Sequence, residues 1–341
     1  MAYATITKPS LHFNTKLYTG NGGTQSITGV GFQPDWIWGK NRDDTNWHNL
    51  YDAVRGVNKA IISNENSAES TRATGLSAFG TDGFTTGADG NLNGNGDNYV
   101  AWNWKANGAG SSNSDGTITS TVSANTTAGF SIATWTGTGS NGSVGHGLGG
   151  VDCMIIKDLS NTRDWYFWNK TMAYNTRLEL NNTEVFTTGT DNMTALPDST
   201  KINMATSTQN NGSGNNYVGY FFQEKTGYSK FGSYTGNGNA NGAFIYTGFK
   251  PAWVIIKPTT VAQNWQIHDT KRDGYNPNND NLSSNNSNAE ADNKFIDIVS
   301  NGFKLRRSDV LNVSGDPYIY MAFAEEPLVA NVGNSIPATA R

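Results

Sequence analysis

The pattern of hydrophobic and polar positions repeats three times along the chain. A short polar turn, a tyrosine and a run of alternating bulky side chains occur together at 96–104, 214–222 and 315–323. Side chains of a β-strand point alternately to its two faces, so the bulky residues of each run share one face. These faces are Val100/Trp102/Trp104, Val218/Tyr220/Phe222 and Ile319/Met321/Phe323. We predict three equivalent strands whose bulky residues each fill the core of their own module.

Other landmarks keep a regular spacing to these strands. An aromatic-Thr-Gly sequence precedes the tyrosine of each strand by 81, 82 and 84 positions, in the pairs Tyr18/Tyr99, Trp135/Tyr217 and Tyr234/Tyr318. Between these landmarks, the segment 31–40 matches 248–257 almost residue for residue. A less similar copy at 150–157 also ends on a lysine. A tryptophan follows each copy, at Trp47, Trp165 and Trp265. A period of roughly 100 residues makes each repeat the size of a domain.

The predicted fold is all-β, with three tandem β-sandwich modules and little or no helix. Short apolar runs alternate with Gly- and Asn-rich turns, and no segment has helical periodicity. The expected organisation is a first module at 1–106 that includes an N-terminal lead-in (1–16), a Gly/Ser/Asn linker at 107–116, modules at 117–225 and 226–327, and a C-terminal tail at 328–341. Because hardly any spacer separates the last two modules, we expect them to pack tightly and the first to be freer.

Composition excludes several classes of protein. The 341 residues include 10 Trp, 14 Tyr and 15 Phe, an aromatic content that argues against disorder. A net charge of −4 with 15% charged residues favours neither nucleic acid nor an anionic membrane as a partner. No secretory signal and no apolar stretch of transmembrane length is visible, so we expect no membrane insertion. Cys153, the single cysteine, lies in an apolar run and is predicted to be a buried, inert thiol.

No constellation of residues indicates catalysis or a cofactor. The four histidines are scattered, and no zinc or nucleophile motif occurs, so we predict a non-enzyme without metal or cofactor. Asp52 and Asp269 recur after the repeated tryptophan, but Asn169 takes the middle place. An amide cannot act as a catalytic acid, so an asparagine at one of the three equivalent positions argues against catalysis there. These residues are instead predicted to make hydrogen bonds at strand ends.

Two further polar sets have alternative interpretations. Lys40, Lys157 and Lys257 end equivalent strands and are expected to reach solvent or pair with a carboxylate. The loop 81–98 contains several aspartates, which suit calcium by ligand type but match no EF-hand spacing. We predict that 81–98 is a solvated loop, with a calcium-binding loop as the alternative.

The aromatic residues divide into predicted core and predicted surface. Trp36, Trp102, Trp104 and Trp253 lie on apolar strand faces and are expected in the core. Three aromatics lie in more polar surroundings and are the candidate sugar-stacking residues: Trp47, Trp168 and Tyr275.

Several motifs together carry a resemblance to a known family. They are Gly-Phe-Gln-Pro-Asp-Trp-Ile-Trp-Gly-Lys at 31–40, Leu-Tyr-Asp-Ala-Val-Arg-Gly at 50–56, Tyr-Val-Ala-Trp-Asn-Trp-Lys at 99–105, the Thr-rich run 117–129 and the ending Pro-Ala-Thr-Ala-Arg at 337–341. This combination resembles a repeat domain found in structural proteins of marine tailed bacteriophages. The resemblance implies a virion component built from concanavalin-like or jelly-roll sandwiches, and it offers no catalytic residues to carry over.

The expected function is therefore that of a non-enzymatic phage virion structural protein. It would be assembled in the host cytoplasm and displayed on the virion surface, in a tail-fibre or tail-tip position, with a role in recognising a host-surface glycan. Its expected partners are other virion proteins, further copies of itself in a homo-oligomer, and that glycan. The alternatives are a capsid decoration or fibre-forming subunit, and a polysaccharide depolymerase.

Overall fold

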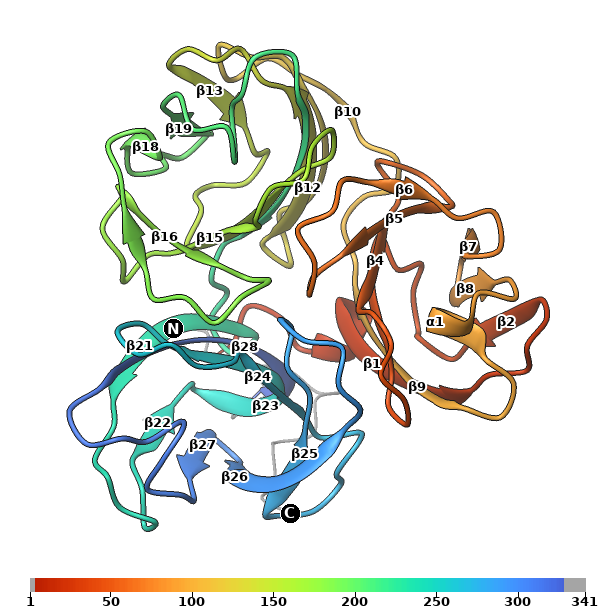
Figure 1. Ribbon diagram of the computed structural model, residues 1–341, viewed down its shortest axis with the longest axis vertical. Helices are drawn as coiled ribbons and strands as arrows, with labels where there is room; N and C mark the ends of the chain where they lie inside the picture. Colours follow the sequence, from red (N-terminus) through yellow and green to blue (C-terminus); the bar gives the residue numbers. More distant parts are fainter. Residues whose placement is uncertain (1–3, 328–341) are drawn as a thin grey trace.

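The computed structural model describes residues 4–327 and confirms the all-β prediction. The strands form six sheets, and consecutive stretches of chain contribute these sheets in pairs. Figure 1 shows three lobes arranged around a common centre. We name the lobes by their strands: the first module holds β1–β9, the second β10–β20 and the third β21–β28.

In the first module, a six-stranded sheet of order β1-β9-β3-β4-β5-β6 accompanies a three-stranded sheet of order β2-β8-β7. The strands are β1 (Phe13–Thr19), β2 (Gln25–Thr28), β3 (Trp36–Asn41), β4 (Asn49–Asp52), β5 (Lys59–Ile62), β6 (Ser70–Thr71), β7 (Leu76–Gly80), β8 (Gly83–Thr86) and β9 (Asn98–Trp104).

In the second module, an eight-stranded sheet of order β10-β11-β12-β20-β14-β15-β16-β17 accompanies a three-stranded sheet of order β13-β19-β18. The strands are β10 (Ser111–Asn113), β11 (Ser120–Asn125), β12 (Phe130–Thr136), β13 (Gly142–Gly145), β14 (Cys153–Asp158), β15 (Tyr166–Asn169), β16 (Thr176–Glu179), β17 (Thr187–Thr188), β18 (Met193–Ala195), β19 (Lys201–Met204) and β20 (Asn216–Phe222).

The third module has two four-stranded sheets, of order β21-β28-β23-β24 and β22-β27-β26-β25. The strands are β21 (Ser229–Thr235), β22 (Phe244–Tyr246), β23 (Phe249–Pro258), β24 (Gln266–Asp269), β25 (Asn278–Asn281), β26 (Ala291–Val299), β27 (Gly302–Leu305) and β28 (Pro317–Pro327). The three predicted final strands are thus β9, β20 and β28, and each is flanked on both sides in its sheet.

Local structure departs from the sequence predictions in three places. The predicted linker contains β10, which pairs with β11 as the outermost strand of the eight-stranded sheet. The predicted lead-in contains a turn of 3-10 helix, η1 (Pro9–Leu11), and the first residues of β1. The loop 81–98 contains one helical turn, α1 (Gly90–Asn93), capped by Asp89. The predicted tail 328–341 lies outside the described residues.

The large sheet of the first module is apolar on both faces, and the faces have different partners. Ile37 and Ala101 pack with Leu76 of β7 and Phe84 of β8, in the core between the two sheets of the module. The residues that alternate with them on β3 and β9 belong to a second, larger cluster that runs through all three modules. Contacts between the paired sheets recur in the third module, where the Phe303 and Tyr320 ring centroids are 5.4 Å apart.

The large cluster joins the modules through aromatic rings. The ring of Trp36 lies 4.4 Å from that of Tyr220, and Trp104 lies 5.6 Å from Trp253. These side chains are almost completely buried, so Trp36, Trp102, Trp104 and Trp253 are core residues as predicted. The prediction that each set fills its own module is wrong, because these rings lie between modules. The expectation that the first module is freer is also wrong, since its rings contact both of the others.

Candidate functional site at the module junctions

Three equivalent positions meet where the modules converge. The Ser63 hydroxyl donates to the backbone carbonyl of Ser284, at 2.8 Å. The Ser284 hydroxyl in turn donates to the carbonyl of Leu180, at 3.2 Å. The first module is thereby tied to the third and the third to the second, through groups buried at the centre of the ring.

Around this centre, one side chain of each module reaches into a neighbour. Trp165 Nε1 donates to the carbonyl of Ile62 at 2.9 Å, and Trp265 Nε1 donates to that of Glu179 at 3.0 Å. In the first module the equivalent residue is His48, which lies against the backbone of Ser283. The second module thus contacts the first, the third contacts the second, and the first contacts the third, which closes a pseudo-threefold ring.

An asparagine fixes the register of these three residues. Its Oδ1 accepts the backbone N–H in the pairs Asn64/His48, Asn181/Trp165 and Asn285/Trp265. The sequence pattern assigned Trp47 to the repeated tryptophan position, and the structure shows this to be wrong by one residue. Trp47 lies one position earlier and is 41% exposed, whereas His48 is fully buried.

Two of the three repeated lysines also bridge modules. Lys157 Nζ donates to the carbonyl of Asn66 in the first module, at 3.1 Å, and Lys257 Nζ to that of Thr183 in the second, at 2.9 Å. Each of these lysines, and Lys40, also donates to carbonyls of its own loop. Burial lowers the pKa of all three lysines to about 8. The prediction that they reach solvent or pair with a carboxylate is wrong, because their hydrogen bonds go to backbone carbonyls.

A buried ionic triad lies at the junction of the first and second modules, the 1–2 junction. Arg55 Nε lies 2.6 Å from Asp52 Oδ2, and Arg55 Nη1 lies 3.0 Å from Glu69 Oε2. The Tyr220 hydroxyl of the second module donates to the same Asp52 oxygen at 2.7 Å. The Arg55 and Asp52 side chains are 3% and 0% exposed. The Tyr220–Asp52 hydrogen bond therefore ties the second module to the buried part of the triad, while Glu69 is partly exposed.

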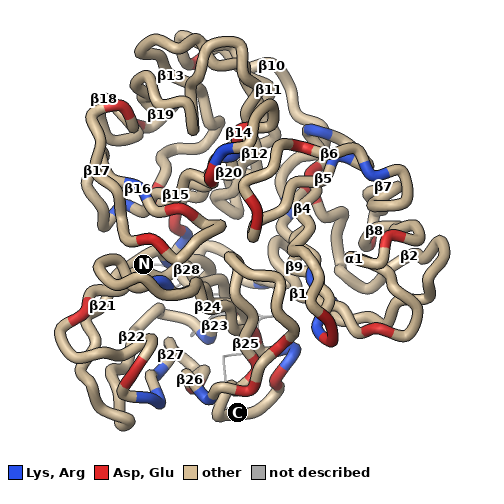
Figure 2. Tube along the Cα trace, in the orientation of Figure 1, with Lys and Arg blue, Asp and Glu red and all other residues tan. Residues whose placement is uncertain are grey.

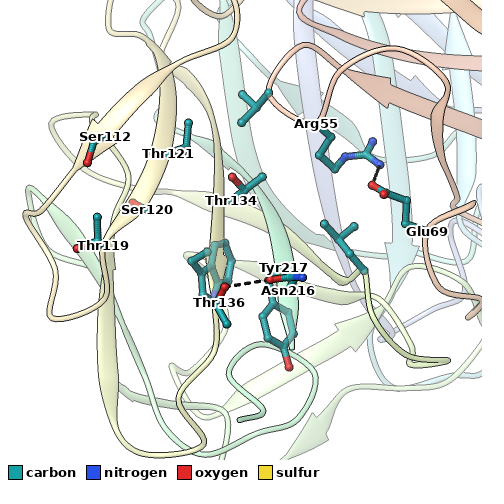
Figure 3. Close-up of a pocket in the computed structure, with 13 residues that line it drawn as sticks. Arg55, Glu69, Ser112, Thr119, Ser120, Thr121, Thr134, Thr136, Asn216 and Tyr217 are labelled. Carbon is teal, nitrogen blue, oxygen red and sulfur yellow. Dashed lines mark hydrogen bonds and ion pairs between the residues drawn. The ribbon is translucent and has the colours of Figure 1, made fainter. Parts of the chain in front are cut away.

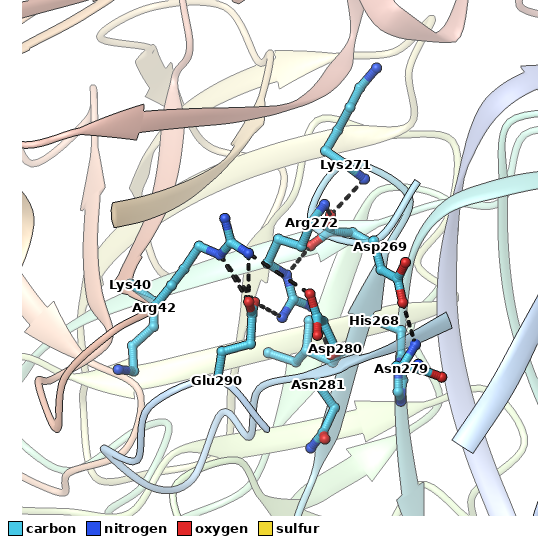
Figure 4. A network of polar contacts seen from close by, with 12 residues as sticks. Lys40, Arg42, His268, Asp269, Lys271, Arg272, Asn279, Asp280, Asn281 and Glu290 are labelled. Atoms are coloured by element: carbon cyan, nitrogen blue, oxygen red, sulfur yellow. Dashed lines mark hydrogen bonds and ion pairs between the residues drawn. The ribbon is translucent and has the colours of Figure 1, made fainter. Parts of the chain in front are cut away.

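The junction of the third and first modules, the 3–1 junction, repeats the arrangement (Figure 4). Arg272 is paired with Asp269 and Glu290, and Trp102 Nε1 of the first module donates to Asp269 at 3.0 Å. Burial by itself raises the pKa of Asp269, but the adjacent Arg272 outweighs it, so the net shift is downward. Arg42 of the first module adds a second guanidinium, 2.6 Å from Glu290.

At the 2–3 junction the whole triad is replaced. Asn169, Met172 and Phe186 stand where the other junctions have aspartate, arginine and glutamate. Phe186 N–H donates to the Thr259 carbonyl at 3.1 Å, just as Glu69 N–H donates to Leu159. A buried charge without its partner is strongly destabilising, so the three positions must change together. This accounts for the amide at 169, and the predicted hydrogen bonding at these strand ends is confirmed.

Next to the 1–2 triad lies a groove of about 450 Å³ (Figure 3). One wall comes from the second module and carries hydroxyl groups of β10, β11 and β12 together with Asn216 of β20. The other wall includes Val54, Arg55 and Glu69 of the first module. The Arg55–Glu69 ion pair faces the row of hydroxyls across this groove.

An equivalent groove of about 420 Å³ lies at the 2–3 junction, with different chemistry. Ser233 takes the place of Thr134 there, since these residues pair with Ile319 and Val218 at matching points of β28 and β20. Met172 and Phe186 form the wall opposite, in place of arginine and glutamate. One architecture thus gives a polar groove at one junction and an apolar groove at another.

The structure separates the three predicted sugar-stacking residues. Trp168 is 1% exposed, with Nε1 donating to the carbonyl of Ala173, so its predicted exposure is wrong. Trp47 is exposed in the first module, with the Arg72 guanidinium 5.0 Å from its ring centroid. Tyr275 is 78% exposed in the third module. None of the three lines the polar groove, which instead uses the Thr-x-Thr pairs 119–121 and 134–136.

The aspartates of loop 81–98 have separate local roles. Asp82 accepts from the N–H groups of Gly29 and Gly31, and these hydrogen bonds lower its pKa. Asp89 caps α1, while Asp97 accepts from an asparagine of β3. Within residues 4–327, no three acidic, histidine or cysteine side chains gather as a metal site would require. Cys153 is buried, as predicted, and burial raises the pKa of its thiol.

Charge is spread over the whole molecule. Figure 2 shows acidic and basic residues on all three lobes, with uncharged residues making up most of the chain. None of the described helices has the length and apolar character needed to cross a membrane.

Comparison with known proteins places this architecture in a family. Neither the curated proteins nor the solved structures contain a match to the chain. One family model matches residues 8–327, which is nearly the whole of the described chain and includes all three modules. The chain belongs to the DUF7483 family, described as a domain of unknown function.

Proposed function

We propose that this protein is a non-enzymatic structural component of a phage virion, displayed at the particle surface in a tail-fibre or tail-tip position. In this proposal it recognises a host-surface glycan, and its other partners are virion proteins and further copies of itself. The resemblance of the repeated motifs to virion proteins of tailed phages supports the setting.

The observation that carries the structural role is the use made of the buried charged groups. The triads around Arg55 and Arg272 each accept a hydrogen bond from the neighbouring module, and the lysines at 157 and 257 donate to carbonyls of a neighbouring module. Perturbed ionisable groups often mark catalytic sites, but ion networks that hold a structure together perturb them as well. Here each triad accepts a hydrogen bond from an aromatic side chain of the neighbouring module, and the two lysines donate to carbonyls of a neighbouring module. Such contacts across the junctions are expected of a rigid scaffold.

The experiment is to locate the protein on the particle. Purified virions from the source phage would be labelled with an antibody raised against residues 4–327, and the particle would be reconstructed by cryo-electron microscopy. Label and matching three-lobed density at the tail support the proposal. Density over the capsid lattice would instead favour a decoration protein, and absence from the particle would refute a virion role.

The non-enzymatic part of the proposal has its own test. Incubating the protein with purified host-surface polysaccharide and analysing the products by size-exclusion chromatography should leave the polymer length unchanged. Release of oligosaccharides that is lost on heat denaturation of the protein would identify a depolymerase.

A further inference from the structure

The face that β12 turns toward the 1–2 junction changes chemistry along the strand. Phe130 and Ile132 are buried in the shared aromatic core. Thr134 and Thr136 continue the same face, because strand residues two apart point to the same side. Thr134 is partly buried and Thr136 is exposed. The junction therefore begins as an apolar core and ends as a surface of hydroxyl groups.

Those hydroxyls form a ladder across adjacent strands. Thr121 of β11 lies directly opposite Thr134 of β12, and Ser112 of β10 lies opposite Thr121. Thr119 lies two residues before Thr121 and also lines the groove. Among the described residues, the hydroxyls of these four side chains have no hydrogen-bond partner. Each offers one donor and two acceptor sites to a bound molecule.

The described residues that line the opposite wall supply an acceptor but no unpaired cation. The Arg55 guanidinium is already used by Asp52, Glu69 and the carbonyl of Lys59. Glu69 Oε1 has a looser contact, 3.5 Å from the exposed Lys59 ammonium. A ligand rich in hydroxyl groups can donate to this carboxylate, whereas an anionic ligand would meet a negative charge with no available arginine to offset it.

The groove at the 2–3 junction has the same architecture as the 1–2 groove but different chemistry. At the 2–3 junction, Met172 and Phe186 replace the ionic wall, and Pro317 and Ser233 replace Asn216 and Thr134. A ligand held by several hydroxyl groups would find far fewer partners there. The chain therefore contains a matched groove that serves as an internal control.

From these observations we infer that the 1–2 groove binds a neutral, hydroxyl-rich oligosaccharide, with sugar hydroxyls bonded along the Thr121–Thr134 ladder and to Glu69. The inference rests on the proposed function and gives the glycan a specific site. Val54 and Leu159 line the same groove and supply apolar surface for the sugar C–H groups.

The test is isothermal titration calorimetry with defined hexasaccharides. The probes are maltohexaose, cellohexaose and chitohexaose as neutral ligands, and hexagalacturonate as the anionic one. At least one neutral probe should bind the full chain. The double variant Thr121→Val/Thr134→Val keeps the side-chain shape and should weaken binding about fivefold or more, since two hydrogen bonds are lost. Ser233→Ala, in the matched groove, should change the affinity less than about twofold.

Three results would overturn the inference: no neutral probe binding at about 5 mM, binding of hexagalacturonate alone, or equal affinity in the double variant with its circular dichroism spectrum unchanged. The particle experiment is independent of all three. Tail labelling combined with any of them would refute the groove and leave the virion role standing. Neutral-glycan binding by a protein that is absent from virions would refute the virion role and leave the groove as a glycan site.

Discussion

Replacing Arg55 by methionine should destabilise the protein far more than replacing the complete triad. Among residues 4–327, Arg55 is the one cationic partner of Asp52, and the single change removes it. The Asp52 side chain is 0% exposed and otherwise accepts from the Tyr220 hydroxyl and a backbone N–H. Removing one partner of a buried ion pair costs about 3–5 kcal/mol, because the remaining charge stays desolvated. Arg55→Met should lower the free energy of unfolding by that amount.

The triple variant Asp52→Asn/Arg55→Met/Glu69→Phe copies the set Asn169, Met172 and Phe186 found at the 2–3 junction. Buried ion networks replaced by apolar groups of similar volume are often neutral in stability or better. We expect the triple variant to recover at least about 2 kcal/mol relative to Arg55→Met, although it contains more substitutions. Such recovery would show that the three positions are energetically coupled.

Equilibrium urea unfolding at pH 7, followed by tryptophan fluorescence and circular dichroism, gives the comparison. Lys59→Ala is the matched control, since it removes a 41% exposed cation from the same Glu69 and should cost less than about 0.5 kcal/mol. A triple variant as unstable as Arg55→Met would refute the reasoning. It would mean that shape at the 1–2 junction, and not charge balance, decides stability there.

Other predictions test the shared core, the buried lysines and the reassigned tryptophan. Trp36→Ala should lower the free energy of unfolding by about 3–5 kcal/mol. It should also increase proteolytic cleavage within 107–116, because the rings between the first two modules lose their contacts. Unchanged cleavage would argue against a shared core. The pKa of Lys157 is about 8 in the folded state and roughly 10.4 in the unfolded state. Between about pH 8 and roughly 10.4 the folded state therefore binds fewer protons at Lys157 than the unfolded state does, so the contribution of Lys157 to stability should rise with pH. The advantage of wild type over Lys157→Met should therefore grow by about 1–2 kcal/mol from pH 7.5 to 9.5 in urea unfolding, and a constant difference would contradict the burial of a charged lysine. In thermal unfolding, Trp168→Ala should lower the free energy of unfolding by about 3–5 kcal/mol, whereas Trp47→Ala should change it by less than about 1 kcal/mol. Equal losses in the two variants would contradict the burial of Trp168 and the exposure of Trp47.

Sequence periodicity indicated the three repeated final strands, but it placed Trp47 where His48 belongs and predicted an exposed Trp168 that is buried. The alternation in β9, β20 and β28 follows from backbone geometry, and so it was readable without coordinates. The assignment of Trp47 to the repeat failed because a one-residue offset leaves the spacing of tryptophans nearly unchanged. The Asn64 amide, which bonds the His48 N–H, sets the true register. The groove was missed because its walls come from residues far apart in the chain, although two Thr-x-Thr pairs marked one wall.

The sequence by itself determined the repeat, the all-β character and the identity of the residues that share each strand face, because these depend on local backbone geometry and on spacing. It also determined that Trp36 and Trp104 must be buried. Only the tertiary structure decided which surface covers those rings: the neighbouring modules, and not the second sheet of their own module. The reason is physical, since apolar area gains the same free energy whichever surface covers it. The choice was made by directional hydrogen bonds to Asp52 and Asp269 and from Ser63 and Ser284, whose partners in these bonds lie more than 100 residues away in sequence.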